Sequence, residues 1–535
     1  MDNFVSYPLR VTYEVVQGKD MNRSNTVFIL ILLFAAVLSY ANSLQNQFIW
    51  DDEDWILRNT TVKDWHKWPA LFTQNSIHGA RKGSNFYRPI QAISHGIDYL
   101  VWGYKLPGHH ASNIFFHAIA AILLFLLLKN IFSQSMAFLS ALFFAMHPVQ
   151  TEAVTYISGR ADPMSVLFIL LSILLFEKNI LLSCLAFLFA IFSKESALVT
   201  PALILLYIIF RDRDVKRELK YLIPFVAIII VYGILRLTAL DFSHTIPENA
   251  PKAFFYVPFY IRLCTFLKTL PVYFGILLWP FGLHMERDIA LSYSIFEPKV
   301  FLGFFMVGAI FLTGFACRKR YKFLLFSAAW SFISIFPNSN IIPINALIYE
   351  HWLYLPSIGF FIAVAWCMDR LLSKGKAFRP LALLLIMLIS SLYIWRTYER
   401  NREWHDPISF YESTIRYKPD SARLHNNLAM AYADEGRLED SIREYKKAIE
   451  FGDYYAQPHY NLSNIYIGKG DYPAAIRELK RSIEIDNSFL YSHETLALIY
   501  FNQNRLELAK KEAVFVLERE PQNKIAQQVL DKLSD

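Results

Sequence analysis

The sequence is poor in cysteine and in charge for its length. It has 4 cysteines in 535 residues, and all of them (Cys184, Cys264, Cys317 and Cys367) lie in or beside apolar runs. Their number and placement exclude a disulfide framework and a zinc-binding spacing. Charged residues make up 19% of the chain, and they gather between the apolar runs and near the C-terminus. The chain therefore divides into a hydrophobic part and a polar part that follows it.

Several sequence motifs of common enzyme and transporter classes are also absent. There is no Walker loop, dinucleotide-binding fingerprint, Gly-x-Ser-x-Gly elbow or His-Glu-x-x-His motif. There are also no corresponding halves of the kind that secondary transporters show. The net charge of +7 comes largely from short loops between apolar runs, which favours membrane orientation over nucleic-acid binding.

Apolar runs long enough to cross a bilayer recur along the first 397 residues. They predict an all-α, polytopic membrane domain of about eleven helices at 25–397, preceded by a polar tail at 1–24 that contains Met21, an alternative start. The predicted spans are 25–44, 111–131, 136–152, 163–177, 179–193, 196–210, 219–240, 299–317, 322–337, 352–371 and 378–396.

The segment 256–282 is apolar, but Arg262 and Lys268 interrupt it, and Pro271 and Pro280 are expected to break it. We therefore expect it to lie at the interface or to be re-entrant. The basic loops 211–220, 318–322 and 374–379 then fall on the cytoplasmic side with the N-terminus, as the positive-inside rule requires. The large loop 45–110, the segment 241–298 and the C-terminal region are placed outside. Arg396, Arg400 and Arg402 count against this placement, because they follow the last span on its outer side.

The region 406–535 repeats itself every 34 residues, the period of tetratricopeptide (TPR) units. The three units are 422–455, 456–489 and 490–523, and they predict a TPR α-solenoid. Gly436, Gly470 and Asn504 correspond to one another at the turn between paired helices, where a left-handed backbone is needed. TPR units commonly bind protein or peptide in a groove, while the alternative is that so short an array only supports the membrane domain.

Ionisable residues gather at the predicted outer ends of the spans, where polar groups are costly and often functional. The run Asp51-Asp-Glu-Asp54 offers a general base, although by charge alone a solvated loop start and helix cap is the better explanation. Its carboxylates form an incomplete ligand set, so no metal site is predicted. The basic residues Arg88, Arg160 and Lys194 are candidates for binding a phosphate. The alternative is a set of structural ion pairs, Arg160 with Asp162 and Lys194 with Glu195.

Several motifs resemble those of the transmembrane-and-TPR O-mannosyltransferases, a family of the GT-C glycosyltransferase class, and their order and spacing match from about residue 25 onward. The motifs are Phe48-Ile-Trp-Asp-Asp52, Tyr87-Arg-Pro89, His110-Ala-Ser-Asn-Ile-Phe-Phe-His117, His147-Pro-Val-Gln-Thr-Glu-Ala-Val154, Gly159-Arg-Ala-Asp162, Ser193-Lys-Glu195 and Glu350-His-Trp-Leu-Tyr-Leu-Pro-Ser357. The resemblance implies transfer of a mannose-like sugar from a polyprenyl-phosphate carrier to Ser or Thr of a protein. It also implies that Asp51 or Asp52 is the catalytic base.

The resemblance leaves supporting roles near the acceptor to His147, Glu152, Glu195, Glu350 and His351. Because the repeat array is short, we expect a bacterial relative, in the inner membrane with its TPR units in the periplasm. A eukaryotic relative would lie in the endoplasmic reticulum membrane, with its TPR units in the lumen. The alternatives are a non-enzymatic membrane scaffold that presents TPR units to a protein partner and, with less support, a flippase for a lipid carrier. No cofactor is predicted apart from the lipid-linked sugar, which is a substrate.

Overall fold

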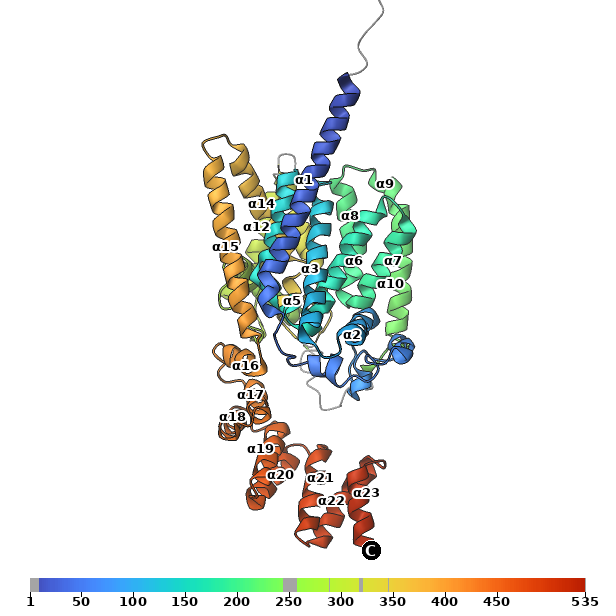
Figure 1. Cartoon of the computed structure of the whole chain (residues 1–535), viewed down its shortest axis with the longest axis vertical. Helices are drawn as coiled ribbons and strands as arrows, with labels where there is room; N and C mark the ends of the chain where they lie inside the picture. The colour runs from blue at the N-terminus through green and yellow to red at the C-terminus, as the bar shows by residue number, and fades with distance from the viewer. Residues whose placement is uncertain (1–8, 244–256, 288, 317–320, 345, 535) are drawn as a thin grey trace, which may run out of the picture. The chain divides into compact units, whose positions relative to one another are not determined.

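The computed structural model describes residues 9–243, 257–287, 289–316, 321–344 and 346–534 (Figure 1). Most of the described residues are helical, and none of them forms a strand. They form two compact units, Met1–Asp406 and Pro407–Asp535. Several predicted features lie wholly or partly outside the described residues: part of the tail 1–24, Cys317, most of the basic loop 318–322, and part of the segment 241–298.

The first unit is a bundle of long apolar helices joined by short helical turns. Four helices near its centre, α3, α4, α6 and α14, bury small and aromatic residues such as Ala121, Phe143 and Phe144 against one another. The bounds are α1 (Leu9–Tyr40), α2 (Pro89–Trp102), α3 (Leu106–Leu128), α4 (Gln134–Met146), α5 (Thr151–Val154), α6 (Ala161–Phe176), α7 (Ile180–Ser193), α8 (Thr200–Phe210), α9 (Val215–Glu218), α10 (Ile223–Arg236), α11 (Phe259–Leu278), α12 (Pro298–Ala316), α13 (Lys322–Ile335), α14 (Ser357–Ser373) and α15 (Arg379–Glu403).

Some helices of this bundle start at a capping side chain. Ser133 accepts a hydrogen bond from Met136 N at the start of α4, and Asn179 accepts one from Leu182 N at the start of α7. Only 17% of the apolar window is buried in each of the helices that contain α10, α12 and α15. Those helices therefore present apolar faces outward, as helices in contact with lipid do.

Seven helices among the described residues are long and apolar enough to cross a membrane, and three shorter apolar helices accompany them. The predicted number of eleven crossings stays a prediction. The segment 256–282 contains one of the seven, α11, which continues without a break through Pro271. The expectation that Pro271 would break this segment was wrong, so the non-crossing interpretation rests on the charges of the loops.

Helices α1 and α15 run in the same direction and end together (Figure 1). Asn42 Nδ2 donates to Tyr398 O at 3.0 Å, Asn46 Nδ2 donates to Asn401 O at 2.9 Å, and Gln47 N donates to His405 O at 2.8 Å. When α1 and α15 both cross the membrane in the same direction, the chain crosses it an even number of times after α1, with α15 included in that number. The total from α1 through α15 is then odd, which agrees with an odd prediction such as eleven.

Different polar segments lie at the two ends of the bundle. At the end where α1 begins, Lys322 Nζ contacts Asp212, and Arg211 Nη1 donates to Asn130 O at 2.7 Å. The opposite end holds the loop after α1, the short helices η6 (Ile157–Arg160) and η7 (Glu195–Val199), and η11 (Glu350–Leu353). The loop 45–110, which we placed outside the membrane, therefore shares one end of the bundle with η6, η7 and η11.

The second unit is a solenoid of helix pairs, and its repeats begin where the periodicity placed them. Helices α17, α19 and α21 start at Ala422, Ala456 and Leu490, the first residues of the predicted repeats. The full set is α16 (Pro407–Ile415), α17 (Ala422–Asp434), α18 (Leu438–Phe451), α19 (Ala456–Gly468), α20 (Tyr472–Ile485), α21 (Leu490–Asn502), α22 (Leu506–Arg519) and α23 (Lys524–Ser534). Gly436, Gly470 and Asn504 have φ of 73°, 77° and 57°, which is the left-handed backbone predicted for the turns.

A histidine–glutamate pair ties the two helices of each repeat together. The Nδ1–Oε2 distances are 2.6 Å for His425–Glu444, 2.7 Å for His459–Glu478 and 2.6 Å for His493–Glu512. His459 has a second carboxylate, Asp453, at 2.9 Å from its Nε2. Burial lowers the pKa of His459, but its hydrogen bonds to the two carboxylates outweigh burial and raise the pKa above the usual 6.5.

We expect the solenoid to become less stable as the pH rises, because His459 then loses its attraction to Glu478 and Asp453. A raised histidine pKa gives stability that is complete below the unfolded pKa and lost as the pH rises through the folded pKa. For a fragment of residues 407–535, deprotonation of His459 should lower the free energy of unfolding by about 1 kcal/mol between pH 6 and pH 8.5. The effect is no larger because Asp453 is half-exposed and solvent screens part of the attraction. Urea titrations of wild type and His459→Gln would measure this. Equal slopes against pH in the two proteins would contradict it.

Candidate active site

The loop after α1 is fixed by the carboxylate of Asp52. Its Oδ2 accepts from Ile49 N at 3.0 Å, and its Oδ1 accepts from Ser158 N at 2.8 Å and from Ser158 Oγ at 2.5 Å. The side chain is 1% exposed. Burial raises the pKa of Asp52 to about 7, although the hydrogen bonds oppose this rise. Oδ2 therefore holds the loop to itself and Oδ1 joins the loop to η6, so an acceptor substrate has no open path to either oxygen.

Asp51 has the opposite environment, although it is the next residue. It is exposed, and its backbone N–H donates to Tyr156 Oη at 3.1 Å. The residue before it, Trp50, adopts a left-handed backbone with φ of 54°. This turn and the Asp52 contacts hold Asp51 at the surface of the loop. Of the two predicted base candidates, Asp51 is the one that a substrate can reach.

Arg160 is the centre of a buried polar network between α2, α3 and η6. Its Nε donates to Asn113 Oδ1 at 2.6 Å, and its Nη2 contacts Asp98 and donates to His109 O at 3.0 Å. Ser94 Oγ lies 3.3 Å from Nη1. The side chain is fully buried, so it presents no nitrogen to a ligand. These contacts argue for a structural role rather than the predicted phosphate contact.

The other two basic candidates are also in ion pairs, but with different partners from those proposed in the sequence. Lys194 Nζ lies 2.7 Å from both oxygens of Asp162, and both side chains are nearly buried. Arg88 Nε donates to Glu195 Oε2 at 3.0 Å, with 17% of its side chain exposed. The proposed pairs Arg160–Asp162 and Lys194–Glu195 are therefore wrong in their partners. Arg88 is the member of the three that keeps some exposure.

A second polar cluster surrounds η11. Glu152 on α5 accepts from His351 N at 3.0 Å and from His351 Nδ1 at 2.7 Å. Burial raises the pKa of Glu152, but His351 outweighs burial, and the pKa falls below its usual value. Glu350 Oε1 accepts from His284 N at 2.6 Å and from Arg287 Nη2 at 2.7 Å. The sequence placed Glu152, Glu350 and His351 near a common site, and the structure brings them together.

His147 is a structural residue rather than a supporting one. Its Nδ1 accepts from Val149 N at 3.1 Å, so Nε2 carries the proton and donates to Leu277 O at 3.2 Å. The ring is fully buried. It therefore holds the end of α11 against the segment that follows α4.

Some residues of these networks were not predicted from the sequence. Asp98, Asn113 and Ser158 complete the contacts of Arg160 and Asp52, and Arg287 and Arg400 surround Glu350. The signal available for Asp98 and Asn113 was a polar side chain inside an otherwise apolar helical run. No signal of that kind marks Arg287, which lies between helices.

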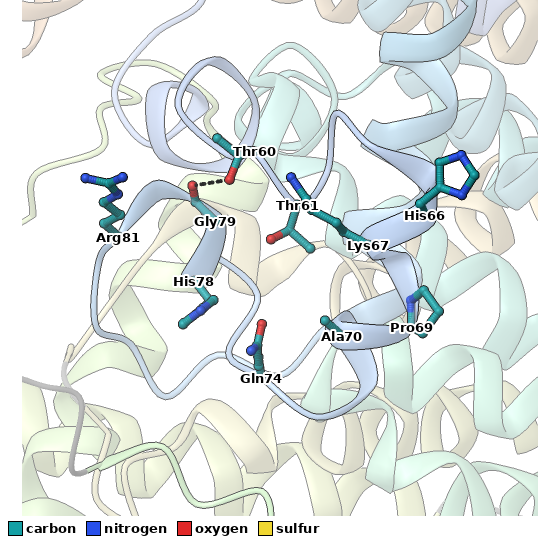
Figure 2. Close-up of a pocket in the computed structure, with 10 residues that line it drawn as sticks. All are labelled: Thr60, Thr61, His66, Lys67, Pro69, Ala70, Gln74, His78, Gly79 and Arg81. Atoms are coloured by element: carbon teal, nitrogen blue, oxygen red, sulfur yellow. Dashed lines mark hydrogen bonds between the residues drawn. The ribbon is translucent and has the colours of Figure 1, made fainter.

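The loop after α1 also contains a solvent-open pocket of about 580 Å³ (Figure 2). Thr60 and Gly79 close one side through a hydrogen bond of 3.0 Å from Thr60 Oγ1 to Gly79 O, and His66, Lys67 and His78 stand around its rim. None of the predicted site residues lines this pocket. Among the residues that the structure describes, no group of three or more His, Cys, Asp or Glu side chains could hold a metal ion.

Comparisons with known proteins match both units of the chain. A family model described as dolichyl-phosphate-mannose-protein mannosyltransferase matches residues 109–235, and a tetratricopeptide repeat model matches residues 420–488. Among solved structures, the APC/C hetero-tetramer Cut9–Hcn1 is 13% identical, with coverage of 84% of this chain and 90% of that chain; the TM-score of 0.25 establishes no common fold.

Similar curated proteins include a protein O-mannosyl-transferase of Caenorhabditis elegans, 27% identical over 79% of this chain, and the human protein O-mannosyl-transferases TMTC3 and TMTC1, 25% and 23% identical over 78% and 77%. The chain spans 62%, 51% and 53% of the length of these three relatives. The matches confirm the resemblance seen in the sequence: the chain is similar to the protein O-mannosyl-transferases of the TMTC type.

Proposed function

We propose that the protein is a membrane glycosyltransferase. It would move a mannose-like sugar from a polyprenyl-phosphate carrier to a Ser or Thr hydroxyl of a protein outside the cytoplasm. The observation that carries this proposal is the contrast between Asp51 and Asp52: one carboxylate is exposed, on a loop that the other fixes in place. A general base needs this combination of access and fixed position. The similarity to protein O-mannosyl-transferases supports the choice of sugar and acceptor.

The proposed reaction is a displacement with inversion at the sugar C1 atom. The acceptor hydroxyl oxygen forms a bond to C1 while the bond from C1 to the phosphate oxygen breaks. Asp51 takes the hydroxyl proton, and the polyprenyl phosphate leaves with the electron pair of the broken bond. Arg88 is the member of the predicted basic set that can approach the phosphate, if it exchanges its bond to Glu195 for one to the ligand. Arg160 and Lys194 hold the elements around the site in place.

We place the Asp51 end of the membrane unit on the periplasmic side of a bacterial inner membrane, or on the lumenal side in a eukaryotic relative. The TPR unit would bind the acceptor protein or a partner that presents it. The support for this placement is the gathering of basic loops at the opposite end, where Arg211 and Lys322 lie.

A transfer assay in reconstituted vesicles tests the function. Purified protein would be given radiolabelled polyprenyl-phosphate mannose, or the same carrier with another hexose, together with a pool of periplasmic or lumenal proteins. We expect alkali-labile label on protein with at least one donor, and none with a nucleotide sugar. No transfer with any lipid-linked donor, while residues 407–535 still capture a protein, would favour the scaffold hypothesis. Movement of the carrier across the vesicle without transfer would favour a flippase.

A further inference from the structure

Helix α2 has its polar side chains on the inside of the protein and its apolar side chains on the outside. His95 and Asp98 are 0% and 5% exposed, whereas Ile97, Leu100 and Val101 are 50%, 51% and 61% exposed. Spacings of three and four residues put these three apolar side chains on one face of the helix. A helix at a surface in contact with water shows the opposite arrangement. The outer face of α2 is therefore suited to apolar surroundings rather than to water.

Two aromatic residues extend this face where the chain turns from α2 into α3. Trp102 and Tyr104 are 44% and 53% exposed. The ring of Trp102 lies against Gly108 in the first turn of α3, where any larger side chain would collide with it. Lys63 Nζ lies 5.1 Å from the centroid of the Tyr104 ring. Membrane proteins place Trp and Tyr at the boundary between lipid head groups and acyl chains, so these two residues mark that level on the molecule.

The helices that α2 contacts present apolar side chains to lipid. α2 packs against α3 and α7 at the end of the bundle opposite the start of α1 (Figure 1). α3 is long and apolar enough to cross a membrane, and its Phe115 is 58% exposed. On α7, Leu181 and Leu185 are 75% and 46% exposed. Trp102 and Leu106, the first residue of α3, are four residues apart, a separation of at most about 14 Å. The exposed face of α2 is therefore close to the end of a helix that can span the bilayer.

We propose that α2 lies in the membrane leaflet at the Asp51 end of the bundle. Ile97, Leu100 and Val101 contact acyl chains, while the aromatic residues at the end of α2 lie at the level of the head groups. An amphipathic helix with one apolar face lies in the interface in this way. Lipid is a better match than a protein partner, because these three side chains offer none of the hydrogen bonds that protein interfaces contain.

Membrane contact of α2 also sets the height at which the candidate base is held. Asp98 on α2 pairs with Arg160 of η6, and Asp52 accepts two hydrogen bonds from Ser158 of η6. The helix α2, the turn η6 and the loop that carries Asp51 are therefore joined by buried polar contacts. Lipid that holds α2 at the head groups holds Asp51 near the same level, where a lipid-linked sugar phosphate lies. This consequence rests on the proposed function, whereas the lipid contact of α2 does not.

Spin labels on the full chain in phosphatidylcholine vesicles test this contact without any sugar transfer. The four native cysteines are replaced by Ala, and single labels are attached to Leu100→Cys, Val101→Cys and two controls. Phe115→Cys on α3 is the control for lipid, and Lys67→Cys, at a side chain 55% exposed in the same loop as α2, is the control for water. Oxygen dissolves in the acyl region, whereas a charged nickel chelate stays in water. We expect the ratio of oxygen to chelate collisions at Leu100 and Val101 to be at least threefold higher than at Lys67.

A ratio at both positions equal to that at Lys67 would overturn the proposal. Low collision rates with both reagents would also overturn it, because a second copy of the chain or another protein would then cover the face. Trp102 gives a second measurement in the unlabelled protein. Brominated phosphatidylcholine should quench the part of the emission that Trp102→Phe removes, and unchanged emission would contradict the level assigned to Trp102.

The lipid contact and the proposed function fail separately. Lipid-like ratios at Leu100 and Val101, without transfer to any protein, would leave the contact and remove the proposed function. Water-like ratios together with sugar transfer by wild type would leave the function and remove the contact.

Discussion

Replacing Asp51 by Asn is expected to lower sugar transfer about 10²- to 10⁴-fold, the usual contribution of a general base, while the protein still folds. Asn has nearly the same shape as Asp but cannot take the proton of the acceptor hydroxyl. The side chain of Asp51 is exposed, and the contact that positions it is made by its backbone N–H. The measurement is the initial rate of label transfer in vesicles, with the melting temperature of each purified variant beside it.

Neighbouring carboxylates provide matched controls for Asp51. Glu53 is half-exposed on the same loop and pairs with Arg58, so Glu53→Gln should keep nearly full activity. Asp52→Asn should lower the melting temperature, because Asp52 accepts one hydrogen bond from within the loop and two from Ser158 of η6. Transfer at the wild-type rate by Asp51→Asn would rule out Asp51 as the base. If Asp52→Asn alone lost activity without any loss of stability, the roles of the two residues would be reversed.

Removing Arg160 is expected to have the largest effect on stability in the membrane unit. Arg160→Met leaves the carboxylate of Asp98 buried at 5% exposure without its main cationic partner. Breaking a buried ion pair from one side costs about 3–5 kcal/mol. Asn113 Oδ1 also loses its donor in this variant. We expect a large drop in melting temperature in detergent, measured by the loss of the monodisperse peak in size-exclusion chromatography.

A second substitution separates the ion pair from the packing of Arg160. Asp98→Asn/Arg160→Met should recover part of the lost stability, because no unpaired charge is then buried. Arg160→Lys should recover little, since one ammonium group cannot reach Asp98, Asn113 and Ser94 together. If Arg160→Met had the melting temperature of the wild type but bound undecaprenyl phosphate more weakly, Arg160 would be a ligand contact and not a structural residue.

The sequence by itself determined the helical class and the repeats. A bilayer requires long apolar helices, so the positions of most helices follow from local composition. The 34-residue period of the TPR unit is visible in the sequence itself. The left-handed turns at Gly436, Gly470 and Asn504 could be predicted because Gly and Asn adopt that backbone conformation at low cost. The family resemblance rested on short motifs and their order along the chain. Both can be read from the sequence without knowing which residues are in contact.

Only the tertiary structure decided which charged groups meet. Arg160 and Asp162 are two residues apart on helical backbone, where side chains at that spacing do not face each other. Lys194 has an extended backbone, in which adjacent side chains point to opposite sides, so it does not face Glu195. The observed partners, Asp98 for Arg160 and Asp162 for Lys194, come from other helices. The same holds for Asp51 and Asp52, which are identical in chemistry: the packing of η6 against the loop buries one and exposes the other. Packing between helices that are distant in sequence decides how deeply each charged side chain is buried and which partner it meets. The local sequence around that side chain specifies neither.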